Sequence, residues 1–274
     1  MDIFGLIGEK LSHSFSPKIH NPIFKELKIN GVYNLFSVNR KNSFDIVNSL
    51  KILGVKGVNV TIPYKELVME QLDYISPEAE KIGAINTILI KDEKSYGYNT
   101  DYYGFGKMLE REFIEIKNNS FCVLGAGGAA KSIIHYLNDM EAEKITLVSR
   151  DKEKAKVKFS NIDIEVIDYE QLKNIKNIYG VINTTPCGMF PNVDKSAISK
   201  EVLKKFKVAI DIIYNPQETL FLKWAKDLGL KVVDGLFMLV GQGVKAEEIW
   251  NECNISKKCE ESIYLNLLKE LNNN

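Results

Sequence analysis

Residues 121–132, FCVLGAGGAAKS, combine a short apolar run, a glycine-rich turn and the start of a helical pattern. The run 121–124 has the apolar character of a strand buried on both faces. Gly125, Gly127 and Ala130 follow it with the G-x-G-x-x-G/A spacing. Such glycines permit a tight turn and a close approach of backbone to a pyrophosphate, which the amides at the helix start then face. The stretch therefore predicts a dinucleotide-binding strand, turn and helix.

The same stretch also comes close to a phosphate-binding P-loop, because residues 125–132 have the pattern G-x-x-x-x-A-K-S. In that alternative, residues 208–211 would form the strand that supplies a magnesium-binding acid. The residue before Lys131 is Ala130, which lacks the conformational freedom that a glycine gives a phosphate-cradling loop. A P-loop NTPase is the second hypothesis, and it predicts magnesium-dependent ATP binding without a nicotinamide requirement.

Charge balance and cysteine content argue against several other classes of protein. Lys plus Arg, 36, equals Asp plus Glu, 36, so no overall field favours nucleic acid or an anionic membrane. The four cysteines include no C-x-x-C pair and do not cluster with the three histidines, so no metal is expected. Sparse cysteine, with Cys122 in a predicted strand, favours a cytoplasmic location. No apolar run approaches the length that crosses a bilayer.

Strand and helix patterns alternate along nearly the whole chain, which predicts an α/β protein with parallel sheets and helices on their faces. The glycine-rich stretch comes after 120 residues, so the dinucleotide-binding unit is not the amino-terminal domain. Another domain must bind the substrate, and the cleft between the two domains is the expected place.

Local signals predict several elements before the glycine-rich stretch. Ser16 followed by Pro17 is typical of an N-cap with proline at N1, so a helix is expected from there towards Lys28. Two of the further helices are expected at about 64–72 and at 102–114. Taken alone, Asp101 would be the N-cap of the helix at 102–114.

The turn after the second strand of the predicted dinucleotide fold bears on the choice of cofactor. An acid there binds the ribose 2′-hydroxyl of NAD, whereas an arginine suits the 2′-phosphate of NADP. Here the strand at 145–148 runs into Ser149, Arg150 and Asp151. Arg150 favours NADP because its guanidinium can hold a phosphate or stack on adenine, while Asp151 leaves NAD as the alternative.

Short blocks follow one another along the chain: SFSP at 14–17 with His20 and Asn21, NVTIPYK at 59–65, GAINT at 83–87, NTD at 99–101, the glycine-rich stretch, NTT at 183–185, and DGL at 234–236 with Gly241 and Gln242. Together, within a match from Ile3 to about Trp250, these blocks resemble the shikimate dehydrogenase family. The resemblance implies the reversible, NADP-linked reduction of 3-dehydroshikimate to shikimate in aromatic amino-acid biosynthesis.

The resemblance also implies the domain organisation. It implies an α/β substrate-binding domain at 1–101, a doubly wound Rossmann domain for NADP at 102–235, and carboxy-terminal helices at 236–274 that return to the first domain. Expected partners are a small-molecule substrate and no nucleic acid or membrane, and the chain is expected to be a monomer or a homodimer.

Carried over by position, the resemblance implies that Ser14 and Ser16 bond the substrate carboxylate, with help from Tyr214. Both serines lie just before or at a predicted helix start, where free amides and the helix dipole stabilise an anion. The side chains expected at the ring hydroxyls are Thr61, Lys65, Asn86, Asp101 and Gln242. The side chains and backbone expected at the cofactor are Gly125, Ala126, Gly127, Gly128, Ala129, Ser149, Arg150, Lys154, Thr184, Thr185, Ile212 and Gly235.

Lys65 and Asp101 are the pair expected to handle the proton. In the reductive direction, hydride arriving at a carbonyl carbon leaves an alkoxide, which a lysine ammonium can protonate. Asp101 would favour the charged lysine and orient it. In the oxidative direction Lys65 must first lose its proton, so oxidation is expected to rise at alkaline pH.

Several positions depart from the family pattern. The family often has Asn-Arg-Thr at 149–151, where this chain has Ser-Arg-Asp, and serines in place of Pro186 and Cys187. The nearest alternative is a quinate/shikimate dehydrogenase that uses NAD, and a non-catalytic binding protein with the same fold is a further one. Assays with shikimate and quinate under both cofactors distinguish them.

Overall fold

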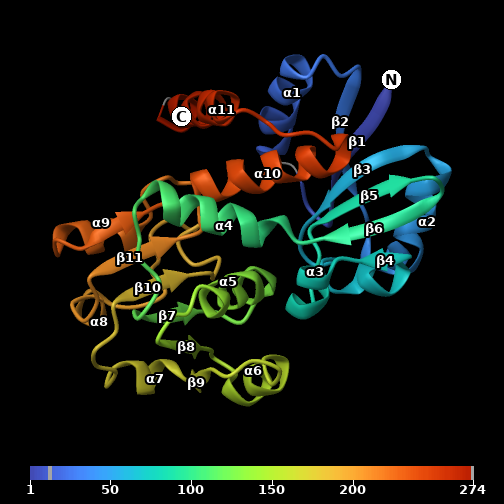
Figure 1. Cartoon of the computed structure of the whole chain (residues 1–274). Helices are drawn as coiled ribbons and strands as arrows, with labels where there is room; N and C mark the ends of the chain where they lie inside the picture. Colours follow the sequence, from blue (N-terminus) through green and yellow to red (C-terminus); the bar gives the residue numbers. More distant parts are fainter. Residues whose placement is uncertain (12–13, 273–274) are drawn as a thin grey trace. The chain divides into compact units, whose positions relative to one another are not determined.

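The computed structural model describes residues 1–11 and 14–272, and these form two compact α/β units (Figure 1). The first unit comprises Met1–Gly104 together with Val240–Glu270. The second is built on Phe105–Leu239. The segment Val240–Glu270 therefore joins the amino-terminal part of the chain in the first unit.

The first unit contains a mixed sheet with the strand order β2-β1-β3-β5-β6-β4. Its strands are β1 (Asp2–Gly8), β2 (Gly31–Ser37), β3 (Val55–Val60), β4 (Tyr74–Ile75), β5 (Thr87–Lys91) and β6 (Lys94–Tyr98). β1 runs parallel to β2 and β3, whereas β5 is antiparallel to β3 and β6. The register places Asn59 opposite Thr87, so polar residues of two sequence blocks meet in the middle of the sheet.

Helices of the first unit come from both ends of the chain. They are α1 (Ser16–Glu26), the 3₁₀ helix η1 (Arg40–Asp45), α2 (Ile46–Ile52), the 3₁₀ helix η2 (Leu67–Gln71), α3 (Pro77–Ile82), the start of α4 (Thr100–Arg111), most of α10 (Leu236–Asn251) and α11 (Lys257–Asn272). Trp250 of α10 packs directly on Gly57 of β3, where a Cβ would lie 2.6 Å from the indole. Its Nε1 donates to the carbonyl of Ile88 at 2.9 Å, which anchors α10 on the sheet.

Two expected helix starts are corrected in the first unit. Ser16 is the first residue of α1 and not its N-cap, which is Phe15, a residue without a capping side-chain hydrogen bond. Asp101 lies within the first turn of α4 and does not cap it. The cap is Asn99, whose Oδ1 accepts the amide of Tyr102 at 3.2 Å. The carboxylate of Asp101 is thereby left for another partner.

The helix expected at about 64–72 is also wrong, since the segment forms only the short 3₁₀ helix η2. The carbonyl of Lys65 accepts the amide of Ile85 at 2.9 Å, outside its own segment, and so is withdrawn from a continuous helical ladder. The hydroxyl of Tyr64, a buried residue, donates to the carbonyl of Val38 at 2.5 Å. These contacts hold the segment around Lys65 in an irregular conformation against the sheet.

The second unit is a parallel sheet with the order β12-β11-β10-β7-β8-β9. Its strands are β7 (Ser120–Leu124), β8 (Lys144–Val148), β9 (Glu165–Ile167), β10 (Gly180–Asn183), β11 (Val208–Asp211) and β12 (Lys231–Val233). Its remaining helices are α5 (Gly128–Asp139), α6 (Lys152–Lys158), α7 (Tyr169–Leu172), α8 (Lys200–Leu203) and α9 (Leu220–Asp227). The strand order reverses between β7 and β10, which is the switch point of a doubly wound sheet. The predicted fold class is confirmed.

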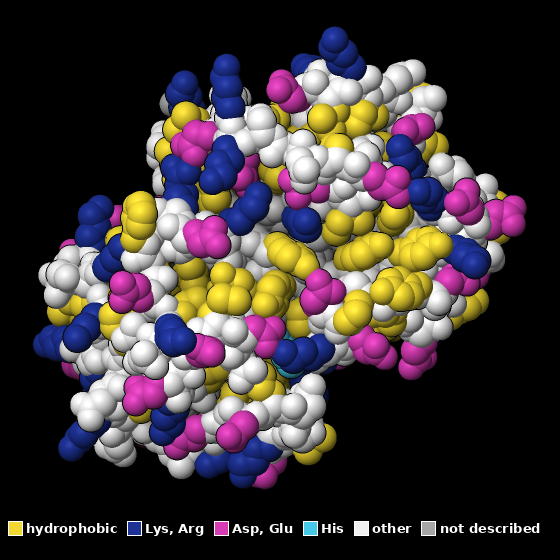
Figure 2. Space-filling model, in the orientation of Figure 1, with side chains coloured by type: hydrophobic (Ala, Val, Ile, Leu, Met, Phe, Trp, Pro, Cys, Tyr) yellow, Lys and Arg dark blue, Asp and Glu magenta, His cyan; other side chains and the backbone are white. Residues whose placement is uncertain are grey.

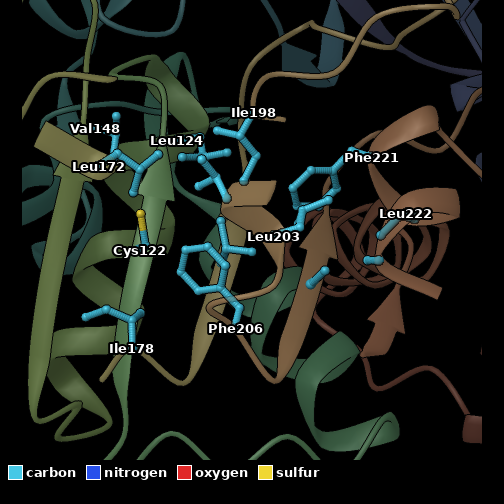
Figure 3. Packing of buried hydrophobic residues seen from close by; sticks show 14 of the residues in the cluster. Cys122, Leu124, Val148, Leu172, Ile178, Ile198, Leu203, Phe206, Phe221 and Leu222 are labelled. Atoms are coloured by element: carbon cyan, nitrogen blue, oxygen red, sulfur yellow. The ribbon is translucent and has the colours of Figure 1, made fainter. Parts of the chain in front are cut away.

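The core of the second unit explains the apolar runs of its strands. Cys122 and Leu124 of β7 point into one cluster with residues of α7, α8 and α9, such as Phe221 (Figure 3). Phe121 and Val123 alternate with them and so face the other side of the sheet, where α5 packs against β7. All four side chains are fully buried. A strand covered on both faces has no place for the polar alternation of an exposed sheet.

The surface agrees with the balanced charge of the sequence. Figure 2 shows basic and acidic side chains interspersed over the visible face, without a large field of one sign. Among the residues that the structure describes, no helix is both long and apolar enough to span a bilayer.

Candidate active site

Lys65 and Asp101 form an ion pair in the first unit, with Nζ 2.5 Å from Oδ2. Lys65 lies in the irregular segment after β3, and Asp101 lies in the first turn of α4. Their side chains are 16% and 11% exposed, respectively. The pair is therefore largely shielded from water yet open enough to meet a small molecule, and the low exposure strengthens their electrostatic interaction.

Asn86 fixes the orientation of Asp101. Its Nδ2 donates to Asp101 Oδ1 at 2.8 Å, and its Oδ1 accepts the amide of Thr100 at 2.7 Å. Thr87 Oγ1 also donates to that Oδ1, at 3.1 Å. Because only an oxygen can accept these donors, the Asn86 amide has a single orientation. Asp101 is consequently held so that Oδ2 faces Lys65.

A buried polar chain continues behind Asn86. Tyr33 donates its hydroxyl to Asn59 Oδ1 at 2.8 Å, and Asn59 Nδ2 donates to Thr87 Oγ1 at 3.1 Å. Burial raises the pKa of Tyr33 well above its usual value, so this phenol stays a donor. Sequence reasoning assigned no role to Tyr33, Asn59 or Thr87. For Asn59 and Thr87 the signal was their place inside the NVT and GAINT blocks.

Ser14 and Ser16 meet at the amino terminus of α1. The hydroxyl of Ser14 donates to Ser16 Oγ at 3.1 Å and accepts the Ser16 amide. Ser16 is buried, and Ser14 is half-buried. The helix that begins here has 11 residues, so its first turn presents free amides and a partial positive charge to an anion.

The other residues expected at the substrate divide between the two units. Thr61 follows β3 and is half-buried, and Gln242 is half-buried on the part of α10 that belongs to the first unit. Tyr214 belongs to the second unit, where burial raises the pKa of its hydroxyl. The first unit thus holds Thr61, Gln242, both serines and the Lys65–Asp101 pair.

The glycine-rich turn in the second unit has the geometry that its chemistry requires. Gly125 adopts a φ of +98°, and a Cβ there would lie 2.8 Å from Thr185 Cγ2. Gly127 is the N-cap of α5, and a Cβ on it would meet no atom within 4 Å. Thr184 donates its amide and its hydroxyl to the carbonyl of Leu124, at 3.0 and 2.7 Å. The open space over Gly127 and the amides of α5 fit a bound pyrophosphate.

The turn after β8 separates the roles of Arg150 and Asp151. Asp151 is the N-cap of α6, with its Oδ1 accepting the amide of Lys154 at 3.0 Å. Ser149 is buried, and its Oγ accepts the Asp151 amide at 3.2 Å. Arg150 is exposed and makes no ion pair with the part of the chain that the structure describes. Its guanidinium is available for a phosphate, whereas the carboxylate of Asp151 is already engaged.

Gly235 and Ile212 lie in direct backbone contact. A Cβ on Gly235 would lie 2.1 Å from the carbonyl oxygen of Ile212, and the Gly235 amide donates to the carbonyl of Ile213 at 3.1 Å. Only glycine allows β11 and the start of α10 to meet so closely at this point.

The P-loop alternative does not fit the structure. Ser132, which would have to ligate magnesium, is fully buried in α5. Asp211, the candidate acid, is also fully buried and accepts hydrogen bonds from Asn183 and Thr219. Within residues 1–11 and 14–272, no group of three His, Cys, Asp or Glu side chains could hold a metal ion.

Comparisons with known proteins agree with this geometry. Residues 6–88 match the family model of the shikimate dehydrogenase substrate binding domain, and residues 107–217 match that of shikimate / quinate 5-dehydrogenase. A shikimate dehydrogenase (NADP(+)) of Clostridium perfringens is 66% identical over 264 residues, which cover 96% of this chain and 97% of the relative.

Solved structures extend the similarity to the fold. A chorismate mutase/shikimate 5-dehydrogenase fusion protein from Clostridium acetobutylicum is 47% identical, with a TM-score of 0.95 and 99% of each chain covered. A shikimate 5-dehydrogenase from Thermus thermophilus, in complex with NADP(H) and shikimate, is 29% identical, with a TM-score of 0.87 over 97% of this chain and 99% of the other. With both halves of the chain matched by family models and a 66% identical relative over nearly its full length, this chain belongs to the shikimate dehydrogenase family.

Proposed function

We propose that this chain catalyses the reversible, NADP-dependent reduction of 3-dehydroshikimate to shikimate, with Lys65 and Asp101 handling the proton. These roles rest on one observation, the chain of hydrogen bonds from Asn86 to Asp101 and from Lys65 to Asp101. Asn86 orients the Asp101 carboxylate, and the carboxylate in turn holds the largely buried Lys65 ammonium in one position. The first unit is the substrate-binding domain in this proposal, and the second is the NADP-binding domain.

The residues of the second unit would hold NADPH, which would supply the hydride for the C3 carbonyl. Lys65 donates a proton from Nζ to the resulting alkoxide oxygen, so the carbonyl becomes a hydroxyl and the lysine becomes neutral. Asp101 stabilises the charged ammonium before the transfer and keeps Nζ in place. Because the Lys65 side chain is 16% exposed, water can return the proton between turnovers. The oxidative direction reverses each step.

The substrate carboxylate is held at the start of α1 in this proposal. Ser14 and Ser16 offer hydroxyl donors beside the free amides of the helix, and a carboxylate there replaces the contact between the two hydroxyls. Thr61, Asn86 and Gln242 are assigned to ring hydroxyls. Asn86 is 2% exposed and its Nδ2 donates to Asp101 Oδ1, so its main contribution is to orient that carboxylate.

The second unit fits NADP better than NAD. The space over Gly127 and the free amides of α5 suit the pyrophosphate, and the exposed Arg150 suits a 2′-phosphate. Asp151 caps α6 instead of presenting its carboxylate to a ribose. The NAD-dependent quinate/shikimate alternative is accordingly not favoured, and the relative with 66% identity is named for NADP(+). Tyr214 is assigned to the substrate carboxylate. The remaining residues assigned to the cofactor are Gly125, Ala126, Gly128, Ala129, Ser149, Lys154, Thr184, Thr185, Ile212 and Gly235.

A two-by-two assay tests this function. Initial rates are measured with shikimate and with quinate, each with NADP and with NAD. We expect the highest kcat/KM for shikimate with NADP. A higher kcat/KM for quinate with NAD would overturn the assignment in favour of the alternative, and absence of nicotinamide reduction under all four conditions would indicate a non-catalytic member of the family.

We further infer a cytoplasmic location from the sparse, unpaired cysteines, and a monomer or homodimer as the assembly state. Analytical ultracentrifugation of the purified chain distinguishes the two assembly states. A larger oligomer would contradict the inference.

A further inference from the structure

Asp211 is a fully buried carboxyl group at the end of β11, and the reaction described above makes no use of it. Its Oδ1 accepts Asn183 Nδ2 at 3.0 Å and the Ile213 amide at 3.1 Å, and its Oδ2 accepts Thr219 Oγ1 at 2.7 Å. A buried carboxyl is costly unless such donors surround it. An apolar side chain in its place would leave these buried donors without this acceptor, so the carboxyl fixes the groups that surround it.

Asn183 transmits the orientation set by Asp211. Its Nδ2 faces the Asp211 carboxyl, and its Oδ1 accepts both the amide and the hydroxyl of Thr185, at 3.1 and 2.7 Å. If the amide group flipped, its NH₂ would face the amide of Thr185 and its oxygen would face the Asp211 oxygen. Asp211 and the Thr185 amide thus oppose the flip together, and Asn183 is held as an acceptor for Thr185.

Thr185 carries this order into the loop beside the glycine-rich turn. Its Oγ1 accepts the amide of Cys187 at 3.2 Å, and its Cγ2 lies against Gly125. The loop leaves the carboxyl end of β10, directly across the switch point from β7. Ligands of doubly wound sheets bind at this place.

We propose that Asp211 is a positioning residue for the cofactor, which fixes the Asn183 amide and thereby holds the loop at 184–188 in its NADPH-binding conformation. The inference rests on the proposed function, because it takes this loop to contact NADPH. It assigns a role to a buried acid that touches neither substrate nor cofactor.

Three variants separate positioning from simple structural support. Asp211→Ala removes the nearer of the two acceptors of Asn183 Nδ2, and the Cys187 carbonyl at 3.4 Å remains as the other. Asp211→Asn keeps an oxygen for Asn183 and can turn its amide towards Thr219. Thr219→Val removes the hydrogen bond to Asp211 Oδ2 and the N-cap of α9, and it leaves the bond between Asp211 and Asn183 in place. The dissociation constant of NADPH is measured by fluorescence titration, with the KM for shikimate and kcat determined in parallel.

We expect Asp211→Ala to weaken NADPH binding about tenfold or more, as loss of one partner of a buried hydrogen bond does. The KM for shikimate should change less than threefold. Asp211→Asn and Thr219→Val should both bind NADPH within about threefold of the unmodified protein. Equal NADPH affinity in Asp211→Ala and the unmodified protein would overturn the inference, as would equal loss in Asp211→Ala and Thr219→Val.

A double-mutant comparison tests the route through Thr185. If Asp211 acts through Asn183 and Thr185, the NADPH affinity of Asp211→Ala/Thr185→Val should be close to that of the weaker single variant. Multiplicative losses would contradict the route. If Asp211→Ala does not fold, Asp211→Ser replaces it, because its side chain is one bond shorter than that of aspartate and lies farther from Asn183. Failure of the unmodified protein to bind NADPH at all would instead refute the proposed function.

Discussion

The buried carboxyl of Asp211 makes the stability of the second unit depend on pH. Burial raises the pKa of this group from 3.8 to about 7, against the opposing effect of the hydrogen bonds from Thr219, Ile213 and Asn183. The folded chain then binds more protons than the unfolded chain between these two values. The contribution of this proton to the free energy of unfolding is therefore fully present below about pH 4, and this contribution is lost as the pH rises through about 7.

The size of the effect follows from these two pKa values. The full change is about 4 kcal/mol, of which about 2.5 kcal/mol falls between pH 5 and pH 8. Asp211→Asn carries no titrating group, so its unfolding free energy lacks this dependence. The unfolding free energy of the variant minus that of the unmodified protein should therefore increase by about 2.5 kcal/mol from pH 5 to pH 8.

Urea denaturation at pH 5 and pH 8 measures this difference, with far-ultraviolet circular dichroism as the signal. Other titrating groups occur in both proteins and cancel in the comparison. Thr219→Val is the matched control, because it keeps the carboxyl and should retain a pH dependence. A stability difference between Asp211→Asn and the unmodified protein that is the same at both pH values would refute the reasoning.

Three further substitutions test other parts of the structure. His20→Leu should lower the free energy of unfolding by about 3–5 kcal/mol in urea denaturation, because it leaves Glu247 buried without the imidazole that lies 2.6 Å away; a loss below 1 kcal/mol would contradict this. Gly235→Ala should lower stability by about 1–3 kcal/mol, since its methyl group would overlap the carbonyl of Ile212, and an unchanged melting temperature would count against that contact. Arg150→Gln should weaken NADPH binding at least about tenfold and leave NADH binding unchanged in titrations; parallel losses for both cofactors would show that Arg150 does not read the 2′-phosphate.

The sequence predicted the doubly wound unit well because its signals are local. Each strand of that unit is a short apolar run, and the glycines at 125 and 127 stand where a turn and an open N-cap require them. Periodicity and turn chemistry act within a few residues, so they can be read without knowing the fold.

The first unit was harder because long-range contacts override local signals there. Asn99, and not Asp101, caps α4, although both are good N-cap residues. The segment after Pro63 was expected to be helical, yet the Ile85 amide donates to the Lys65 carbonyl and withdraws it from a helical ladder. Neither outcome follows from propensity, since each depends on how β3, β5 and α4 meet.

The candidate site shows the same division. Lys65 and Asp101 were paired through resemblance to a family, and the structure places them in contact. The buried partners that aim Asp101 follow from strand register, which sets Asn59 opposite Thr87. Likewise, Asn183 and Asp211 are in contact because the pairing of β10 with β11 sets them opposite each other. The spacing of residues along the chain does not predict this contact.

Substitution of Lys65 by methionine tests the central claim most directly. Methionine keeps much of the length of the side chain but lacks the ammonium group that would donate the proton. Lys51→Met is the matched control. Lys51 also pairs with an aspartate of the first unit, Asp73, but that carboxylate is far more exposed than that of Asp101. Shikimate oxidation with NADP is followed by absorbance at saturating concentrations and across the alkaline pH range. The account predicts that kcat of Lys65→Met falls about 10²–10⁴-fold and no longer rises at alkaline pH, with KM for shikimate changed only a few-fold. An unchanged kcat with the same alkaline rise in Lys65→Met would contradict the account.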